Sequence, residues 1–292
     1  MSKKLILAIC AVATLLTGAK CSRDHVYSME MANKCVEFHR RKLYPQAIRD
    51  CSKAVSLDPE NEKAHHNLAM VYIETKEYDN AASHLQKAIA LKDGEAIYHY
   101  QLGEVYNQLD NADQAVQQFQ KALDLDDSLF KAHYRMGLAY EKLDEPQKAM
   151  QKYTDSLMQN PKFFDAYREL GNIYLTYDFI PQAEQVLQEG LKALLGQDEE
   201  LSVLHNFLGA VYADKKDHVA AVQEFRAALE LQPNFPEAMF NLGMSYCFVN
   251  VDNAKMWLEK FVASANQATP PEYLAVASGR LAEISSGTPI TE

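Results

Sequence analysis

The sequence predicts an all-α fold, a solenoid of about seven helix hairpins followed by a C-terminal capping helix. The first observation behind this prediction is a pattern of small and aromatic residues that recurs about every 34 positions. The second is a further set of small and bulky residues, three and four positions apart, that follows most copies of the first set. Because a unit of this length is too small to bury its own core, successive units must stack on one another.

The N-terminal residues 1–20 have the composition of an export signal. Lys3 and Lys4 precede an apolar run over residues 5–16, and small residues follow it. This order is typical of a secretory signal peptide, and the run is too short to cross a bilayer comfortably. We therefore expect residues 1–20 to be removed on export and residues 21–27 to form a linker.

Cys21 directly follows this signal, and two interpretations of it stay open. Its place is that of the acylated cysteine of a lipoprotein, which would attach the chain to a membrane through an N-terminal lipid. Lys20 departs from that pattern, which has a small residue there, and cleavage after Ala19 satisfies the small-residue rule as well. With either processing we expect an exported protein of the periplasm or outer membrane, and membrane attachment only through such a lipid.

The charge of the chain argues against nucleic acid as a partner. The formal net charge is −11, and removal of residues 1–20, which contain three lysines and no acidic residue, changes it to −14. No basic cluster remains that could follow a phosphate backbone. The acidic residues are spread along the predicted helices, where they keep an extended surface soluble.

The first helix of each predicted hairpin has a small residue, with an aromatic residue three positions later. The small residues are 34, 34, 34, 34, 38 and 34 positions apart. They are Cys35, Ala69, Gly103, Gly137, Gly171, Gly209 and Gly243. The aromatic residues are Phe38, Tyr72, Tyr106, Tyr140, Tyr174, Tyr212 and Tyr246. An apolar residue precedes the small one in every copy except the first, which has Lys34.

The second helix of each hairpin has its own apolar face. It begins with an alanine twelve positions after the small residue of the first helix, at Ala47, Ala81, Ala115, Ala149, Ala183 and Ala221. A bulky residue follows after four positions in five of these six copies, and a small one after three more. Spacings of three and four lie on one helix face, so small residues that face each other let the two helices approach closely.

This pattern resembles the tetratricopeptide repeat in its period and residue types. The resemblance covers residues 28–266 and implies seven repeats in a right-handed superhelix. The fifth unit has four extra residues around residues 195–201, which we expect to lengthen the connection between hairpins. After the last repeat, Thr269 and two prolines predict the start of a capping helix over residues 267–285. We expect residues 286–292 to be a disordered tail.

Nothing in the sequence indicates an enzyme, a cofactor or a metal site. There is no nucleophile elbow, phosphate-binding glycine loop or metalloprotease helix motif, and the repeats take up nearly all of the chain. Four of the nine histidines occupy one shared repeat position: His65, His99, His133 and His205. Because equivalent positions of stacked repeats lie side by side, they cannot converge on one ion, and we expect half-buried packing residues.

Two cysteines of the first hairpin, Cys35 and Cys51, stand on the helix faces that should approach each other. In an oxidising compartment they could form a disulfide, whose 15-residue loop suggests about 3 kcal/mol of stabilisation. The alternative, two small core residues, is equally compatible with the sequence. Cys247 has no evident partner, and we expect it to be buried.

The resemblance implies that the first helix of each hairpin lines a concave groove that binds a protein or peptide partner. The residues at one shared groove position are Asn33, Asn67, Gln101, Arg135, Glu169, Phe207 and Asn241. Their amides could hydrogen-bond the backbone of an extended peptide. The alternative is that they are simply solvated.

Two further features of the groove could bind a partner. Lys131 and Arg135 match the basic part of the family's carboxylate clamp, although Gln101, His66 and Met70 replace its other members. An apolar patch in the last two repeats is typical of a binding hot spot, unless the capping helix covers it. The patch consists of Phe207, Phe240, Met244 and Phe248.

Two functions are compatible with these observations. The first is a non-enzymatic protein–protein interaction scaffold in the bacterial envelope. In architecture such a protein is similar to the pilotin lipoproteins, which help outer-membrane secretins assemble for type IV pili. The second is a periplasmic adaptor that binds a peptide or glycan and presents it to a separate enzyme.

Overall fold

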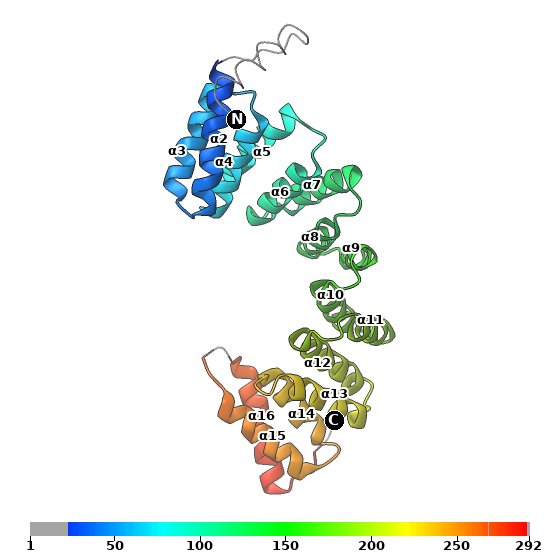
Figure 1. Cartoon of the computed structure of the whole chain (residues 1–292). Coiled ribbons are helices and arrows are strands. Elements are labelled where there is room, and N and C mark those ends of the chain that lie inside the picture. The colour runs from blue at the N-terminus through cyan, green and yellow to red at the C-terminus, as the bar shows by residue number, and fades with distance from the viewer. Residues whose placement is uncertain (1–22, 268, 291–292) are drawn as a thin grey trace. The chain divides into compact units, whose positions relative to one another are not determined.

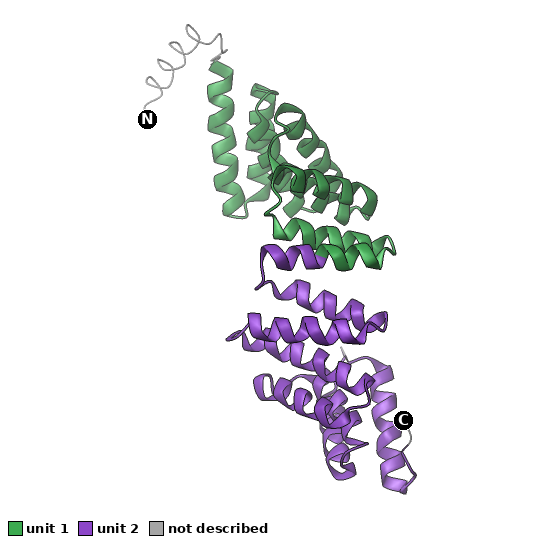
Figure 2. Ribbon diagram, turned by 90° about the vertical axis from the view of Figure 1, so that its right-hand side faces the viewer, with its two compact units in different colours: residues 1–152 green, residues 153–292 purple. Residues whose placement is uncertain are grey.

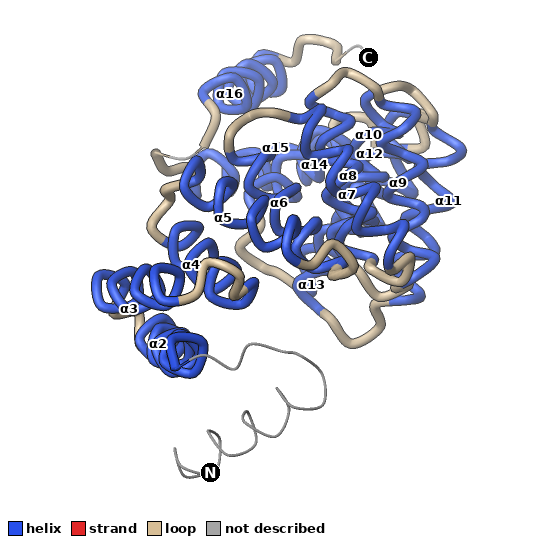
Figure 3. Tube along the Cα trace, turned by 90° about the horizontal axis from the view of Figure 1, so that it is seen from above, coloured by secondary structure: helices blue, strands red, loops and turns tan. Residues whose placement is uncertain are grey.

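The computed structural model describes residues 23–267 and 269–290 (Figure 1). This part of the chain contains fifteen helices and no strand, joined by short loops (Figure 3). The fold is the all-α repeat solenoid that the sequence predicts. The expected export signal and Cys21 lie outside the described residues. Among the helices of the described part, none is both long and apolar enough to span a membrane.

The chain divides into two compact units, residues up to 152 and residues from 153 onward (Figure 2). Unit 1 holds α2 (Arg23–Arg40), α3 (Tyr44–Leu57), α4 (Glu62–Glu74), α5 (Tyr78–Leu91), α6 (Ala96–Gln108), α7 (Ala112–Leu125) and α8 (Phe130–Lys142). The division falls within α9 (Pro146–Gln159). Unit 2 continues with α10 (Phe164–Thr176), α11 (Ile180–Ala193), α12 (Asp198–Asp214), α13 (His218–Leu231), α14 (Pro236–Tyr246), α15 (Val251–Ser264) and α16 (Pro271–Ser286).

Within each unit, consecutive helices pack as hairpins, and the predicted small residues lie at their closest approach. A Cβ atom added to Gly103 on α6 would lie 2.6 Å from the ring of Phe119 on α7. A Cβ atom added to Gly209 on α12 would lie 2.5 Å from the ring of Phe225 on α13. Both rings are fully buried, so the small residue makes room for the bulky residue sixteen positions later.

The turns inside the hairpins repeat with the same period. Six residues other than glycine have a left-handed backbone there, with φ between 56° and 62°. They are Lys42, Lys76, Asp110, Asp144, Asp178 and Lys216. In each turn the next residue donates its backbone N–H to the carbonyl of the repeat's aromatic residue, as Glu77 does to Tyr72 at 2.8 Å. This bond ends the first helix and starts the second at a fixed place.

Three predicted boundaries differ from the structure. Helix α2 begins at Arg23, inside the stretch 21–27 that we predicted as a linker. The capping helix α16 spans Pro271–Ser286 instead of residues 267–285. In the predicted tail, Ile290 packs against the core of the last repeats.

The prediction that four extra residues lengthen a connection between hairpins is wrong. The connection from α11 to α12 has four residues, as many as that from α5 to α6. The insertion instead lengthens α12 to 17 residues, whereas α4, α6, α8 and α10 have 13 each. Because four residues make about one helical turn, the buried face of α12 stays in register.

Candidate protein-binding surface

The predicted groove residues lie on the first helices of the hairpins, α2, α4, α6 and α8 in unit 1 and α10, α12 and α14 in unit 2. We call the side of these helices that carries them the first-helix face. Asn33 is exposed, whereas Asn67, Gln101, Arg135, Phe207 and Asn241 are half-buried. Glu169 on α10 is also half-buried and forms an ion pair with its neighbour Arg168 at 2.6 Å.

In unit 1 the polar side chains of neighbouring first helices bond to one another. His66 on α4 donates from Nε2 to Oε1 of Gln101 on α6, at 2.7 Å. The imidazole also packs on the ring of Tyr98, with 4.7 Å between ring centroids. Burial lowers the pKa of His66, and the hydrogen bond to Gln101 partly opposes this shift. A neutral imidazole therefore holds the Gln101 amide in one orientation.

The same face of unit 1 contains an ion pair. Nε of Arg135 on α8 lies 3.1 Å from Oε1 of Glu104 on α6. Burial raises the pKa of the Glu104 carboxyl, and Arg135 opposes the rise. Of the two predicted clamp cations, Arg135 is therefore already held by a carboxylate, whereas Lys131 is exposed on α8 beside the ring of Phe130.

Unit 2 repeats the contact between neighbouring first helices. Nδ2 of Asn241 on α14 donates to Oδ1 of Asn206 on α12, at 3.0 Å. The two residues are 35 positions apart, as are His66 and Gln101 in unit 1. Both pairs join corresponding repeat positions, although the side chains differ. At these two places, polar groups of the first helices are thus fixed by bonds between successive repeats.

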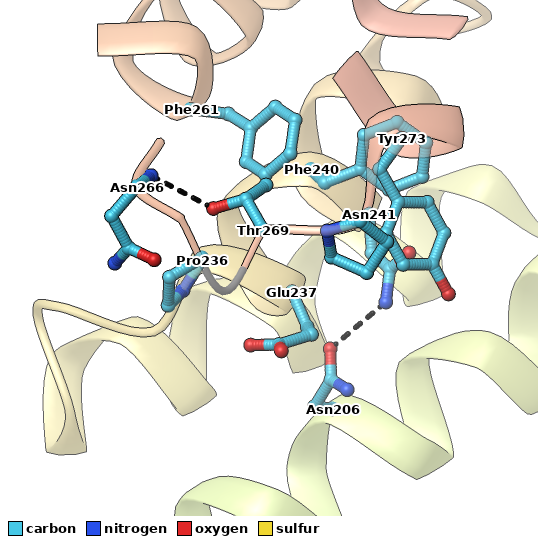
Figure 4. Close-up of a pocket in the computed structure, with 10 residues that line it drawn as sticks. Asn206, Pro236, Glu237, Phe240, Asn241, Phe261, Asn266, Thr269 and Tyr273 are labelled. Atoms are coloured by element: carbon cyan, nitrogen blue, oxygen red, sulfur yellow. Dashed lines mark hydrogen bonds between the residues drawn. The ribbon is translucent and has the colours of Figure 1, made fainter. Parts of the chain in front are cut away.

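Beside Asn206 and Asn241 lies a pocket of about 240 Å³ (Figure 4). It lies between the start of α14, the end of α15, the loop that follows α15 and the start of α16. Its lining residues are Asn206, Pro236, Glu237, Phe240, Asn241, Phe261, Asn266, Thr269, Pro270 and Tyr273. The ring centroid of Phe240 is 5.3 Å from that of Phe261 and 4.9 Å from that of Tyr273. The pocket therefore combines an aromatic wall with amides and one carboxylate.

The structure separates the residues of the predicted apolar patch. Phe240 lines the pocket together with the predicted groove residue Asn241. Phe248 instead stacks on His218 of α13, with ring centroids 4.4 Å apart, and Met244 packs against the C-terminal core. Phe207 is half-buried on α12 and does not line the pocket.

Of the ten residues that line the pocket, sequence reasoning named only Phe240 and Asn241 as site residues, and it missed Asn206, Glu237 and Tyr273 among the other eight. Asn206 occupies the repeat position of His66, so its contact with the next first helix has a signal in the repeat itself. Tyr273 belongs to the capping helix, which lies outside the repeat. No periodic pattern could have placed it beside Phe240.

Three of the four histidines at the shared repeat position pair within their own hairpins. His65 meets His84 at 3.0 Å between Nδ1 atoms, His99 meets Gln118 at 2.8 Å, and His205 meets Glu224 at 2.7 Å. Each partner lies 19 positions later on the second helix. Within the described residues there is no group of three side chains that could hold a metal ion.

Cys35 and Cys51 form a disulfide between α2 and α3, with 5.3 Å between their Cα atoms. Both cysteines are fully buried. The N-terminal helix is also held by the hydroxyl of Ser28, which donates to the carbonyl of Ala54 and accepts from Asn61. Cys247 is buried, and burial raises the pKa of its thiol.

These features define a class of protein: an all-α repeat array in which the successive first helices of each unit present polar and aromatic side chains. Models of the tetratricopeptide repeat match residues 60–128, 131–161 and 203–235. These three segments of the chain are therefore tetratricopeptide repeats. Such repeats act as interaction scaffolds for protein or peptide partners, and the fold is typically non-catalytic.

Comparison with known proteins gives the following similarities. The chain is 33% identical over 68 residues to the tetratricopeptide repeat domain-containing protein PYG7, chloroplastic, of Arabidopsis thaliana, and the match spans 23% of each chain. The C-terminal part of a TPR repeat-containing protein from Cytophaga hutchinsonii has a TM-score of 0.70 at 14% identity, covering 84% of this chain and 98% of that one. YrrB, described as a TPR protein with an unusual peptide-binding site, has a TM-score of 0.55 at 22% identity, covering 68% and 100%. At these identities the structural matches show the fold alone.

Proposed function

We propose that this chain is a non-enzymatic scaffold of the bacterial envelope that holds an extended segment of a protein partner along its first-helix face. One observation carries the proposal: corresponding side chains of neighbouring first helices bond to each other, His66 to Gln101 and Asn206 to Asn241. These bonds fix the amides before a partner arrives. Less side-chain freedom is then lost on binding, which favours affinity.

The fixed amides keep hydrogen-bonding capacity for a ligand. Gln101 uses its carbonyl oxygen towards His66, so its two N–H donors point elsewhere. Asn241 uses one N–H towards Asn206, which leaves its carbonyl oxygen as an acceptor. An extended peptide backbone offers both complementary groups. YrrB, which has the same fold, is described as having a peptide-binding site.

The envelope location is supported by the signal-like residues 1–20 and by the place of Cys21. Helix α2 begins at Arg23, two positions after this cysteine. An acyl group on Cys21 would therefore hold the first repeat close to a membrane surface. In that setting we propose the role of the pilotin lipoproteins, assisting an outer-membrane secretin of a type IV pilus to assemble.

Deletion of the gene and complementation with variants test this proposal. We expect the deletion to abolish secretin multimers on semi-native gels and the wild-type chain to restore them. Gln101→Ala should restore fewer multimers, whereas Gln117→Ala, an exposed glutamine on the second helix α7, should restore all of them. The intact mass should show an acylated Cys21. Unchanged multimers together with an unmodified N-terminal Lys20 would reject the pilus role.

A second candidate is the periplasmic adaptor that presents a peptide or glycan to a separate enzyme. The pocket beside Phe240 favours it, because amides beside aromatic rings suit a small ligand group. Since Asn241 and Phe240 line the same pocket, variants of these two residues cannot separate the candidates. A variant of unit 1 can: loss of ligand binding in Tyr273→Ala but not in Gln101→Ala supports the adaptor, and loss in both variants supports the scaffold.

A further inference from the structure

The pocket between α14 and α16 is suited to a single side chain. Its volume of about 240 Å³ is below the roughly 300–1,000 Å³ of sites for drug-sized ligands. One side of the pocket is formed by the loop before α16, in which Asn266 and Thr269 are joined by two hydrogen bonds. The backbone N–H of Asn266 donates to Oγ1 of Thr269, and the N–H of Thr269 donates to the carbonyl of Asn266, each at 3.0 Å. Asn266 and Thr269, two of the lining residues, are thus bonded to each other.

The opposite sides of this pocket differ in chemistry. Figure 4 shows the rings of Phe240, Phe261 and Tyr273 gathered on one side and Glu237 with the asparagine pair on the other. Tyr273 is 41% exposed, so part of its ring is open to a ligand. Phe240 is held between the rings of Phe261 and Tyr273. A planar group entering here would lie against an aromatic face.

Glu237 gives the pocket its charge. It is the one charged residue among the ten that line the pocket, and its side chain is exposed on the first turn of α14. Among the described residues, no lysine, arginine or histidine forms an ion pair with it. The pocket therefore offers a carboxylate that a ligand can reach, in a chain with a net charge of −11.

We propose that this pocket binds an arginine side chain of the partner segment. A guanidinium is planar, stacks on aromatic rings and donates in a fork to a carboxylate, which matches Phe240, Tyr273 and Glu237 together. The adjoining Asn206–Asn241 pair would contact the backbone that carries the arginine. The negative charge of the chain would attract a basic segment towards the pocket. This inference deepens the proposed scaffold function, since it names the chemistry by which the partner is recognised.

The test uses the purified mature chain and a single-residue probe. N-acetyl-L-arginine methylamide is titrated against ¹⁵N-labelled protein, and N-acetyl-L-citrulline methylamide serves as the neutral probe of nearly the same shape. We expect saturable amide shifts in residues 237–241 and 269–273 for the arginine probe, and binding about five- to tenfold weaker for the citrulline probe. In Glu237→Gln the preference for the arginine probe should fall, because only the stacking on Phe240 and Tyr273 remains.

Glu272→Gln is the matched control. Pro271 and Glu272 begin α16 as Pro236 and Glu237 begin α14, but Glu272 does not line the pocket. Its removal should leave the preference for arginine. The proposal is overturned if the probes bind wild type equally, if the shifts fall elsewhere or do not saturate, or if both variants lose the preference. Since Gln101 lies in unit 1, reduced secretin assembly in Gln101→Ala would leave the scaffold function standing in each of these cases.

Discussion

Replacing Gly209 by alanine should destabilise the repeat that α12 and α13 form, although alanine is the better helix former. The added Cβ would lie 2.5 Å from Cε1 and 2.7 Å from Cδ1 of Phe225. The ring is 1% exposed, so other side chains enclose it. Overpacking of this kind costs about 1–3 kcal/mol, whereas the gain in helix propensity is about 1 kcal/mol. The steric term is the larger over most of its range, and we expect a net loss of up to about 2 kcal/mol.

Hydrogen exchange of the amides in α12 and α13 is the suitable assay, because repeat arrays need not unfold in two states. The control is Gly279→Ala in α16, where an added Cβ meets nothing within 4 Å. It should slow local exchange, since only the propensity term acts there. Gly209→Ala with unchanged or slower exchange would refute the reasoning.

A second substitution, at Phe225, tests whether contact with the Phe225 ring causes the loss of stability. The second repeat has Ala69 on its first helix and Leu85 sixteen positions later, both fully buried. Gly209→Ala combined with Phe225→Leu recreates that pair. If the ring causes the loss, the double variant should be more stable than the sum of the two single effects predicts, with a coupling energy of about 0.5–3 kcal/mol. Additive effects would show that the ring is not the cause.

Three further predictions concern unit 1. Reduction of the Cys35–Cys51 disulfide should lower the stability of the first hairpin by about 3 kcal/mol, seen as faster exchange in α2 and α3 but not in α13. Ser28→Ala should cost about 1–3 kcal/mol, because it leaves a buried amide donor without its acceptor, and proteolysis of α2 should become faster. Burial lowers the pKa of His65 and of His84 below the ordinary value of 6.5, so the unfolded chain takes up protons first. The free energy of unfolding should then fall as the pH drops below 6.5, and His84→Gln should flatten this dependence in urea unfolding.

The repeat could be predicted from the sequence because each hairpin closes through one contact that recurs. A small residue on the first helix and a bulky one sixteen positions later need no knowledge of distant segments, and Gly103 with Phe119 meets as the spacing requires. The prediction for the four extra residues of the fifth unit was wrong because a local signal places them in helix α12. Asp198, Glu199 and Glu200 are acidic residues of a first helical turn, a signal that extends α12 and that outweighs the nearby Gly196.

The pocket could not be predicted from the repeat, because it joins residues that obey different rules. Asn206 and Asn241 follow the repeat, whereas Tyr273 comes from a helix that occurs once and whose position on α14 no period specifies. The row of groove amides was predicted by position, either as hydrogen-bonding groups for an extended peptide or as solvated residues. In the structure, two of its members are bonded to the preceding first helix through His66 and Asn206. Residues of the row that are exposed, such as Asn33, are less constrained, so selectivity for a partner should depend more on the fixed pairs than on the number of amides in the row.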